Sequence, residues 1–259
     1  MMPESIVYLN WDTHFFGKRV GSLCLLATHS LTAGLQSAKC QGFELVYIDS
    51  EREILQSRSG AYLLVDTGGK TKFVKTLDRY SKQVEDNPCI KLYDKHDIDP
   101  EIIALAYLSG HRSRFKLDPC LPPGSFERLY RAWLTNNLHQ MPMAAIYTYQ
   151  VSGTIVGLIT SQWHEATCSI GLLAVLPSWQ GQGIGMQLLK QVESLCVANS
   201  ISRLEVQTQL SNTSAQALYR KNLFIEAESR FLYHAHRIAA WQPEKATCRD
   251  SESCISAEV

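Results

Sequence analysis

The chain has no excess of charge of either sign. Lysine and arginine together number 25, aspartate and glutamate also 25, and the formal net charge is zero at pH 7. Proteins that bind nucleic acid or an anionic membrane surface through bulk electrostatics need a net positive charge. Neither partner is therefore expected, although a neutral chain can still carry a local basic patch. We expect a small-molecule substrate.

Long apolar runs and paired cysteines are also missing. No segment approaches the roughly 20 apolar residues needed to span a bilayer, and the start, Met1-Met2-Pro3-Glu4-Ser5, has neither a basic region nor an apolar signal core. The 8 cysteines are scattered without a C-x-x-C pair. Without an export signal, they are expected to be free thiols of a cytoplasmic protein.

Metal-binding patterns are scarce as well. The only close pair of histidines in the sequence is His234-x-His236. On a strand, we expect this pair at a solvated edge rather than around a metal ion. Neither a zinc nor an iron signature is found, so no metal is predicted.

The chain does contain enough apolar residues for a substantial core. With 259 residues, of which 45% are hydrophobic and 19% charged, it is long enough for one large domain or two small ones. The polar stretch 81–88 is the best linker candidate. We predict a small N-terminal α/β subdomain over 1–87, a second domain over 88–236, and a polar, disordered tail over 237–259.

Hydrophobic periodicity predicts an α/β fold in both parts. In the first part, strands are expected at 20–26, 43–48 and 61–65, helices at 32–39 and 53–59, and a Gly68-Gly69 hairpin turn before a strand at 71–77. In the second part, helices are expected at 102–109, 126–137, 184–195 and 213–221, and strands at 144–151, 154–163, 168–176, 204–208 and 231–236.

The most informative stretch is a glycine loop between an apolar strand and a helix. The strand ends at Leu176-Pro177, and Gln180-Gly181-Gln182-Gly183-Ile184-Gly185 follows. Glycines let successive backbone N–H groups turn toward one point, and the start of a helix adds the positive end of its dipole. Such a site binds phosphate oxygens without a basic side chain. The pattern predicts binding of a diphosphate-bearing cofactor.

Two known kinds of phosphate loop do not fit this pattern. No acidic ribose partner stands at the dinucleotide-fold distance, and no Gly-Lys-Ser/Thr follows as in a P-loop. A purely structural turn is the simplest alternative. The spacing of Gln180, Gly183 and Gly185, Gln-x-x-Gly-x-Gly, resembles the acetyl-CoA pyrophosphate loop of the GNAT superfamily of N-acyltransferases.

The resemblance to GNAT enzymes implies a fold, a cosubstrate and a set of cofactor contacts. The fold would be a mixed, mostly antiparallel sheet flanked by helices, and the cosubstrate would be acetyl-CoA, with no metal. The apolar strand would pair with the pantetheine arm and supply an N–H donor for the oxyanion. The residues implied in cofactor binding are Leu173, Ala174, Val175, Gln180, Gly181, Gln182, Gly183, Ile184, Gly185, Asn212 and Tyr219.

Tyr219 is the expected general acid. It follows Asn212 by seven residues, about two helical turns. By resemblance, Asn-x6-Tyr recurs here in GNAT enzymes, where the tyrosine hydroxyl faces the coenzyme A sulfur. A tyrosine, with a reference pKa of about 10, stays protonated at neutral pH and can protonate the departing thiolate. Taken singly, Asn212 is also explained as a helix N-cap and Tyr219 as a core residue.

The general base is less well defined by the sequence. Asp66, at the end of the strand expected at 61–65, is a catalytic candidate by position, and Glu165 is another. Each is equally explained as a solvated turn residue. A chain of water molecules can also deprotonate an amine that is not strongly basic.

Four further motifs narrow the family. They are Trp11-Asp12-Thr13-His14-Phe15-Phe16-Gly17, His111-Arg112-Ser113-Arg114-Phe115, Ile170-Gly171-Leu172-Leu173-Ala174-Val175 and Val206-Gln207-Thr208-Gln209. In this order, from about residue 7 to 233, the chain resembles the dTDP-4-amino-4,6-dideoxygalactose acyltransferases, the TDP-fucosamine acetyltransferases of enterobacterial common antigen synthesis. The resemblance implies acetyl transfer to the 4-amino group of a dTDP-4-amino-4,6-dideoxy sugar for surface polysaccharide, and the family's habit suggests a homodimer.

Arg114 and Phe115 are the expected acceptor-binding residues. A guanidinium binds phosphate bidentately, and the ring of Phe115 can stack on thymine or on a sugar face. The alternative is an arginine at the surface and a phenylalanine in the core. Two other functions stay open. One is a GNAT enzyme for a protein N-terminus, lysine or polyamine, which would favour an acidic groove; the other is a non-catalytic acyl-CoA-binding protein, which would not need Tyr219.

Overall fold

The computed structural model describes residues 6–77, 87–139 and 143–238. Most of the expected linker 81–88 and of the expected tail 237–259 lies outside the described residues. The N-terminal part contains β1 (Val7–Tyr8), α1 (Asn10–Phe16), β2 (Val20–Leu25), α2 (Leu31–Cys40), β3 (Leu45–Ser50), β4 (Arg58–Ser59) and β5 (Tyr62–Thr76).

The second part begins with a short strand and three helices, followed by the strands that carry most of the sheet. Its elements are β6 (Ile90–Leu92), α3 (Pro100–Gly110), α4 (Arg114–Leu117), α5 (Ser125–His139), β7 (Ala144–Val151), β8 (Thr154–His164), β9 (Thr167–Val175), the 3₁₀ turn η1 (Pro177–Trp179), α6 (Ile184–Ala198), β10 (Arg203–Gln209), α7 (Thr213–Lys221) and β11 (Ile225–Arg237).

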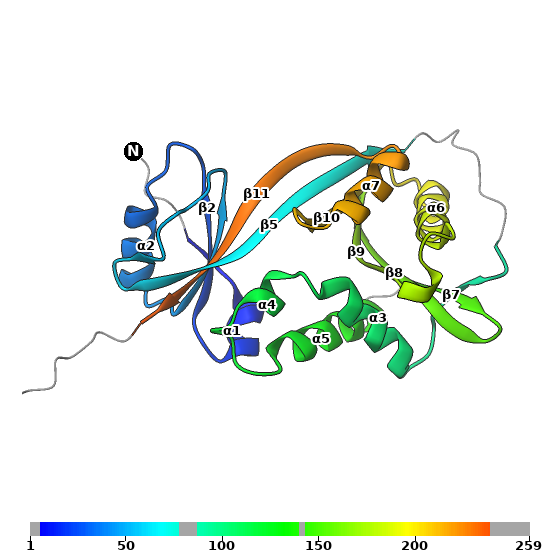
Figure 1. The fold of residues 1–259 in the computed structure, drawn as a ribbon, viewed down its shortest axis with the longest axis horizontal. Coiled ribbons are helices and arrows are strands. Elements are labelled where there is room, and N and C mark those ends of the chain that lie inside the picture. Colours follow the sequence, from blue (N-terminus) through cyan, green and yellow to red (C-terminus); the bar gives the residue numbers. More distant parts are fainter. Residues whose placement is uncertain (1–5, 78–86, 140–142, 239–259) are drawn as a thin grey trace, which may run out of the picture.

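One sheet of 11 strands runs through both parts, in the order β1-β2-β3-β11-β5-β10-β9-β8-β7-β6, with β4 paired to β5. The pairs β2–β3 and β9–β10 are parallel and the others antiparallel. Figure 1 shows α3 and α5 on one side of β8 and β9, and α6 on the other. The expected α/β class, a mostly antiparallel sheet flanked by helices, is confirmed.

Strand β5 connects the two parts. It lies between β10 and β11 and is antiparallel to both. Strand β11 also pairs with β3, so the C-terminal strand closes the N-terminal part of the sheet as well. In Figure 1, β5 and β11 are the two long strands that cross from one part of the molecule to the other. The division at 87/88 stays a prediction, but the sheet itself is continuous across it.

The expected hairpin turn at Gly68-Gly69 is wrong, because β5 runs straight through it. Asp66 pairs with Tyr233 and Gly69 pairs with Phe231, so β5 carries one extra residue between these pairs. Gly68, with φ +84°, accommodates this bulge in a conformation that side chains disfavour. A Cβ on Gly69 would lie 2.7 Å from the carbonyl oxygen of Arg230. The two glycines therefore serve a bulge and a close approach of strands.

Two helix predictions in the N-terminal part also fail. The segment 53–59 is not helical: it is irregular and ends in β4, and the Ile54 N–H donates to the hydroxyl of Tyr233 at 2.8 Å. Conversely, α1 was not expected from the aromatic motif that begins at Trp11. In that helix Trp11 stacks on Phe15, with ring centroids 4.9 Å apart. Local periodicity is weak in so short a helix, so tertiary packing decides both segments.

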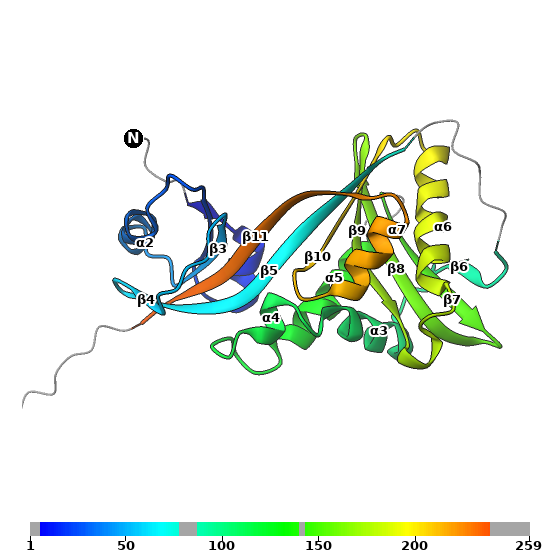
Figure 2. The same cartoon turned by 45° about the horizontal axis from the view of Figure 1, so that its top comes forward.

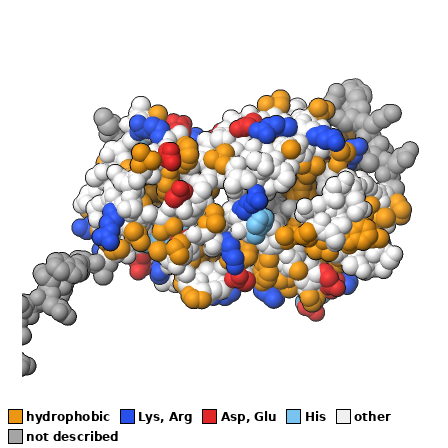
Figure 3. Space-filling view, in the orientation of Figure 1, with side chains coloured by type: hydrophobic (Ala, Val, Ile, Leu, Met, Phe, Trp, Pro, Cys, Tyr) orange, Lys and Arg blue, Asp and Glu red, His pale blue; other side chains and the backbone are white. Residues whose placement is uncertain are grey.

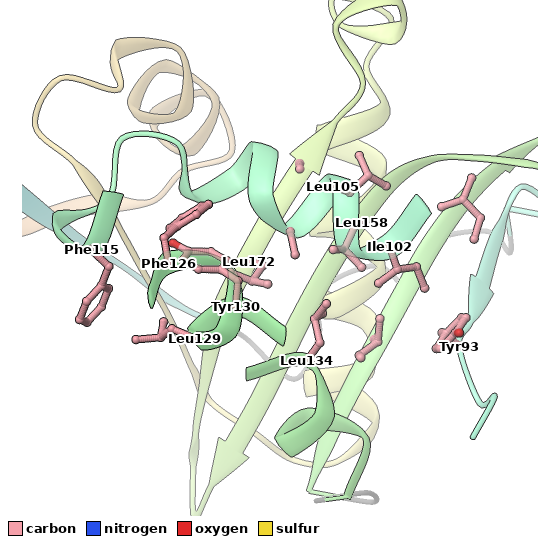
Figure 4. Close-up of a cluster of buried hydrophobic side chains, with 14 of the residues drawn as sticks. Tyr93, Ile102, Leu105, Phe115, Phe126, Leu129, Tyr130, Leu134, Leu158 and Leu172 are labelled. Carbon is pink, nitrogen blue, oxygen red and sulfur yellow. The ribbon is translucent and has the colours of Figure 1, made fainter. Parts of the chain in front are cut away.

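Three buried clusters fill the spaces between the sheet and its helices. The first lies between α3, α5 and the sheet, and Figure 4 shows Ile102, Leu105, Tyr130 and Leu158 within it. The second lies between the sheet and α6 and α7, on the side seen in Figure 2. The third lies under α2. None of the described helices is both long enough and apolar enough to cross a membrane.

Candidate active site

Strands β9 and β10 separate part-way along their length and open a cavity. They are paired from Thr167 and Arg203 to Ile170 and Val206. Beyond that point, the pairing within the described chain joins β9 only to β8, and β10 only to β5. The residues that follow in both strands line a cavity of about 690 Å³. Main-chain groups of β9 are thus free to pair with a ligand in place of a neighbouring strand.

A bulge in β9 marks the place of the opening. Ile159 of β8 pairs with Leu173 and Ser161 pairs with Ile170, so β9 carries one residue more than β8 in this interval. The Leu172 N–H donates to the Thr160 hydroxyl at 2.9 Å instead of to a strand carbonyl. Bulges of this kind re-aim a strand next to a functional site.

The glycine loop lies at one end of the cavity. Gly181 and Gly183 have φ values of +77° and +79°, and α6 begins directly after Gly183. Within the described part of the chain, the backbone N–H groups of residues 181–185 donate to no protein group. The Gln180 side chain donates to the Val175 carbonyl at 2.9 Å and ties the loop to the end of β9. The loop has the geometry of an anion site at a helix N-terminus.

The cavity collects almost all of the residues implied in cofactor binding. Gln182 is not among the lining residues, and its side-chain amide donates to the Ser178 carbonyl at 3.5 Å. The lining residues from the implied set are Leu173, Ala174, Val175, Gln180, Gly181, Gly183, Ile184, Gly185, Asn212 and Tyr219. Asn212 also caps α7, since its side chain accepts from the Ala215 N–H.

Tyr219 combines deep burial with access to the cavity. It is 4% exposed, and its ring packs on Phe73 and Phe224 with centroids 5.6 and 5.7 Å away. Burial raises the pKa of the Tyr219 hydroxyl well above its ordinary value. The phenol is therefore protonated at neutral pH, the form that a general acid needs.

Arg114 and Phe115 line the other end of the cavity. The guanidinium carbon of Arg114 lies 4.3 Å from the ring centroid of Tyr47 and 4.7 Å from that of Phe115. Burial lowers the pKa of Arg114, although Tyr47, Asp12 and Asp49 oppose the shift. No carboxylate in the described chain comes within ion-pair distance of this guanidinium. Arg114 is a desolvated cation held between two rings.

Comparison with known proteins identifies the second part of the chain. Residues 102–223 match the model of the acetyltransferase (GNAT) family. The chain contains a GNAT acetyltransferase domain. It is accordingly an acetyl-CoA-dependent N-acetyltransferase, and it acts on a small molecule. The matched residues include β9, the glycine loop and Tyr219, whereas β5 lies outside them.

Two relatives resemble the chain beyond this domain match. The spore coat polysaccharide biosynthesis protein SpsD of Bacillus subtilis (strain 168) is 24% identical over 234 residues, which cover 86% of this chain and 80% of the relative. The dTDP-fucosamine acetyltransferase of Escherichia coli O6:H1 is 28% identical over 137 residues, which cover 52% of this chain and 58% of that protein. Both names point toward sugar and polysaccharide synthesis.

Solved structures share the fold of the GNAT domain and its N-terminal partner. A functionally unknown conserved protein from Staphylococcus epidermidis has a TM-score of 0.61 at 12% identity, covering 92% of this chain and 93% of that one. A GCN5-related N-acetyltransferase from Sphaerobacter thermophilus has a TM-score of 0.51 at 17% identity, covering 88% and 74%. These likenesses concern the fold alone.

The acceptor end of the cavity also contains residues from outside the GNAT domain. Thr67 and Lys70 of β5 and Leu232 of β11 line it. Lys70 pairs with Asp49 at 2.6 Å, and the Thr67 hydroxyl donates to the Leu232 carbonyl at 2.8 Å. Sequence reasoning missed these residues, because their place depends on β5 pairing with distant strands rather than on any local motif.

The two carboxylates named as candidate bases lie away from the cavity. Asp66 is exposed, and its Oδ1 accepts from the Gly68 N–H at 2.8 Å, a local turn contact. Glu165 stands in the exposed turn between β8 and β9, with φ +52°. Neither lines the cavity of the GNAT domain. Asp66 as the base stays a prediction, and nothing in the geometry of the site depends on it.

The expected solvated edge at His234 and His236 is wrong. His234 is 0% and His236 8% exposed. Their Nδ1 and Nε2 atoms lie 2.6 and 2.7 Å from the same oxygen, Oδ2 of Asp118. Strand β11 is interior to the sheet, between β3 and β5, and the segment after α4 covers this face. Cys120 brings its sulfur within 4.8 Å of Asp118 and His236, but hydrogen bonds already account for the arrangement.

Proposed function

We propose that the chain transfers the acetyl group of acetyl-CoA to the 4-amino group of a dTDP-4-amino-4,6-dideoxy sugar used for surface polysaccharide. One observation carries the choice of acceptor. Among the described residues that line the cavity are the cations Lys70, Arg114 and Lys221, but no aspartate or glutamate. A polyamine or peptide amine, being cationic, would favour acidic residues there, whereas a nucleotide diphosphate favours cations.

The cofactor half of the reaction rests on the glycine loop and on β9. The free N–H groups of residues 181–185 suit the pyrophosphate of acetyl-CoA. The unpaired edge of β9 suits the pantetheine arm, and one of its N–H groups would stabilise the oxyanion that forms on the thioester carbonyl. The names of the two relatives support a sugar acceptor, since one acetylates dTDP-fucosamine and the other serves polysaccharide synthesis.

The chemical step is a direct attack. The neutral amine adds to the thioester carbonyl, the C–S bond breaks, and the departing thiolate takes a proton from the Tyr219 hydroxyl while the amine loses its own proton to the surroundings. Since no carboxylate of the described chain lines the cavity, water is the best acceptor for that proton; Asp66 would have to act through intervening water molecules.

Arg114 would hold the diphosphate of the acceptor, and Phe115 would lie against its thymine or sugar. Basic side chains and a histidine gather near the centre of the face drawn in Figure 3. A guanidinium with no carboxylate partner is ready to bind a phosphate bidentately, because it has no internal ion pair to break first.

A thiol-release assay with acetyl-CoA tests this function. The acceptors are dTDP-4-amino-4,6-dideoxygalactose, its gluco epimer, spermidine and a peptide with a free N-terminus. Turnover with one or both sugars, and with neither of the other amines, is the expected result. Turnover with spermidine or the peptide alone would contradict the sugar acceptor. Acetyl-CoA binding without turnover of any of the four would instead favour a binding protein.

A further inference from the structure

The segment between α3 and α5 carries Arg114 and Phe115 and is anchored at one buried point. That point is Asp118, whose side chain is 0% exposed. Its Oδ2 accepts from His234 at 2.6 Å and from His236 at 2.7 Å, and its Oδ1 accepts from the Cys120 N–H at 2.8 Å. Three donors from two distant stretches of chain therefore hold one carboxylate.

The protonation states follow from this geometry. Burial by itself raises the pKa of Asp118, but the hydrogen bonds from the two histidines hold that pKa well below its ordinary value, so the group is a carboxylate. Burial lowers the pKa of His234 to about 4, so its ring is neutral at pH 7 and Nδ1 carries the proton given to Asp118. The opposite nitrogen, Nε2, is buried with no partner in the described chain.

An unpartnered buried nitrogen is a cost that the fold bears at this position. A leucine of similar size would avoid that cost in an otherwise apolar setting. What the imidazole supplies instead is a directed N–H for Asp118. The arrangement is therefore better explained by what Asp118 holds in place than by core stability.

The acceptor-binding side chains rest directly on this network. The ring of Phe115 lies 5.9 Å from the rings of both His234 and Tyr47, centroid to centroid. The rings of Tyr47 and His234 are 4.7 Å apart, and the Tyr47 hydroxyl donates to Asp12 at 3.0 Å. Arg114 lies over Tyr47. His234 and Tyr47 thus form a floor that supports both side chains.

We propose that Asp118, His234 and His236 are positioning residues that hold the α4 turn so that Arg114 and Phe115 face the acceptor. This inference rests on the proposed function, because it assigns the acceptor end of the same cavity. Leu232, two residues before His234 on β11, lines that cavity. The network therefore fixes the turn to the very strand that forms part of the acceptor wall.

Two substitutions of His234 separate positioning from packing. In His234→Asn the amide nitrogen takes the place of Nδ1 and keeps the donor, whereas His234→Leu fills the space without a donor. His234→Leu should raise the acceptor KM and the dissociation constant for dTDP by roughly 10–100-fold, since the Asp118 contact is charge-assisted. The acetyl-CoA dissociation constant should change less than about twofold. His234→Asn should recover most of the loss.

A second pair of variants covers the case in which His234→Leu does not fold. His236 lies nearer the surface, with a side chain 10% exposed, so His236→Gln, which keeps the donor, and His236→Leu should repeat the pattern. The matched control is Glu127→Gln. It removes the exposed ion pair of Glu127 with Lys116 at 3.1 Å, which ties the same turn to α5 from outside. Such a pair contributes little, so the acceptor KM should stay within about twofold.

The outcomes distinguish this inference from the proposed function. Wild-type protein that neither binds dTDP nor acetylates the amino sugars removes the proposed function, and the inference with it. Wild-type binding of dTDP that both leucine variants retain overturns the positioning role alone. An equal loss of dTDP and acetyl-CoA affinity, with no rescue by His234→Asn or His236→Gln, would show a merely structural role and would also overturn it.

Discussion

At the scale of single residues, Tyr219 should matter for turnover and hardly for anything else. Its hydroxyl has no hydrogen-bond partner in the described part of the chain, so Tyr219→Phe removes no internal contact and leaves the ring packing intact. Losing a positioned acid should lower kcat roughly 10²–10⁴-fold. Acetyl-CoA affinity, measured by calorimetry, should be nearly unchanged. A parallel loss of affinity would speak against the acid role.

The control for that variant is another buried tyrosine. The hydroxyl of Tyr62 donates to the Phe43 carbonyl at 2.7 Å, away from the cavity. Tyr62→Phe should therefore lower the free energy of unfolding by about 1 kcal/mol while kcat stays at the wild-type value. The two tyrosines should give opposite patterns.

Arg114 should show a conflict between stability and function. Its guanidinium is desolvated and has no carboxylate partner, so Arg114→Met removes an uncompensated cation while keeping an unbranched apolar stem. The free energy of unfolding should not fall. The acceptor KM should rise roughly 10–100-fold because the diphosphate loses its bidentate partner. A destabilised variant with a normal acceptor KM would show that Arg114 serves the core instead.

At the scale of elements, the glycine loop can be tested with a matched pair of glycines. Gly183 and Gly153 have φ values of +79° and +82°, and a Cβ on either would meet no atom closer than 3.8 Å. Alanine at each position should therefore cost a similar strain, about 1 kcal/mol. Only Gly183→Ala should raise the acetyl-CoA dissociation constant, by roughly tenfold, since Gly153 lies in the β7–β8 hairpin. Equal affinities in both variants would contradict a phosphate loop.

The pairing of β11 with the α4 turn should make stability depend on pH. The pKa of His234 falls from its ordinary 6.5 to about 4 on folding, so the folded protein binds fewer protons than the unfolded chain between these values. Its contribution is complete above pH 6.5 and is lost as the pH falls toward 4. At pH 5 the loss is about 2 kcal/mol, and Asp118 adds its own loss only below about pH 4.

Urea unfolding at pH 7 and pH 5 measures this effect. The wild-type protein should lose about 2 kcal/mol more over that interval than His234→Asn, which has no titrating ring. The comparison cancels the contributions of the other ionisable groups that the two proteins share. Identical pH dependence in both would show that His234 does not lie buried and neutral in the folded protein.

Elements with a strong local signal could be predicted from the sequence, and those decided by distant partners could not. The helix expected at 213–221 is observed as α7 (Thr213–Lys221), with Asn212 as its cap. The hairpin at Ser152-Gly153 forms because both residues take positive φ. Gly68-Gly69 carries the same kind of local signal, yet β5 continues, since pairing with β10 and β11 on both sides outweighs it.

At the scale of the whole molecule, the same distinction divides the candidate site. The glycine loop and Tyr219 lie within one local strand–loop–helix–strand–helix order, so a motif could point to them. The floor formed by Tyr47 and His234 combines β3 with β11, and Asp118 joins it from a loop more than a hundred residues before His234. Contacts of that range leave no spacing to read in a sequence without the fold.

The last prediction concerns whether the two parts fold alone. Without β5, a fragment of residues 87–238 would leave facing edges of β10 and β11 unpaired and would lose Phe73, which is 0% exposed and packs on Tyr219. Unpaired interior edges and a lost core ring should prevent cooperative folding. Circular dichroism during urea unfolding should show no sharp transition for the fragment and one transition for the full chain. A fragment that unfolds cooperatively and binds acetyl-CoA would establish 87/88 as a boundary between independent domains.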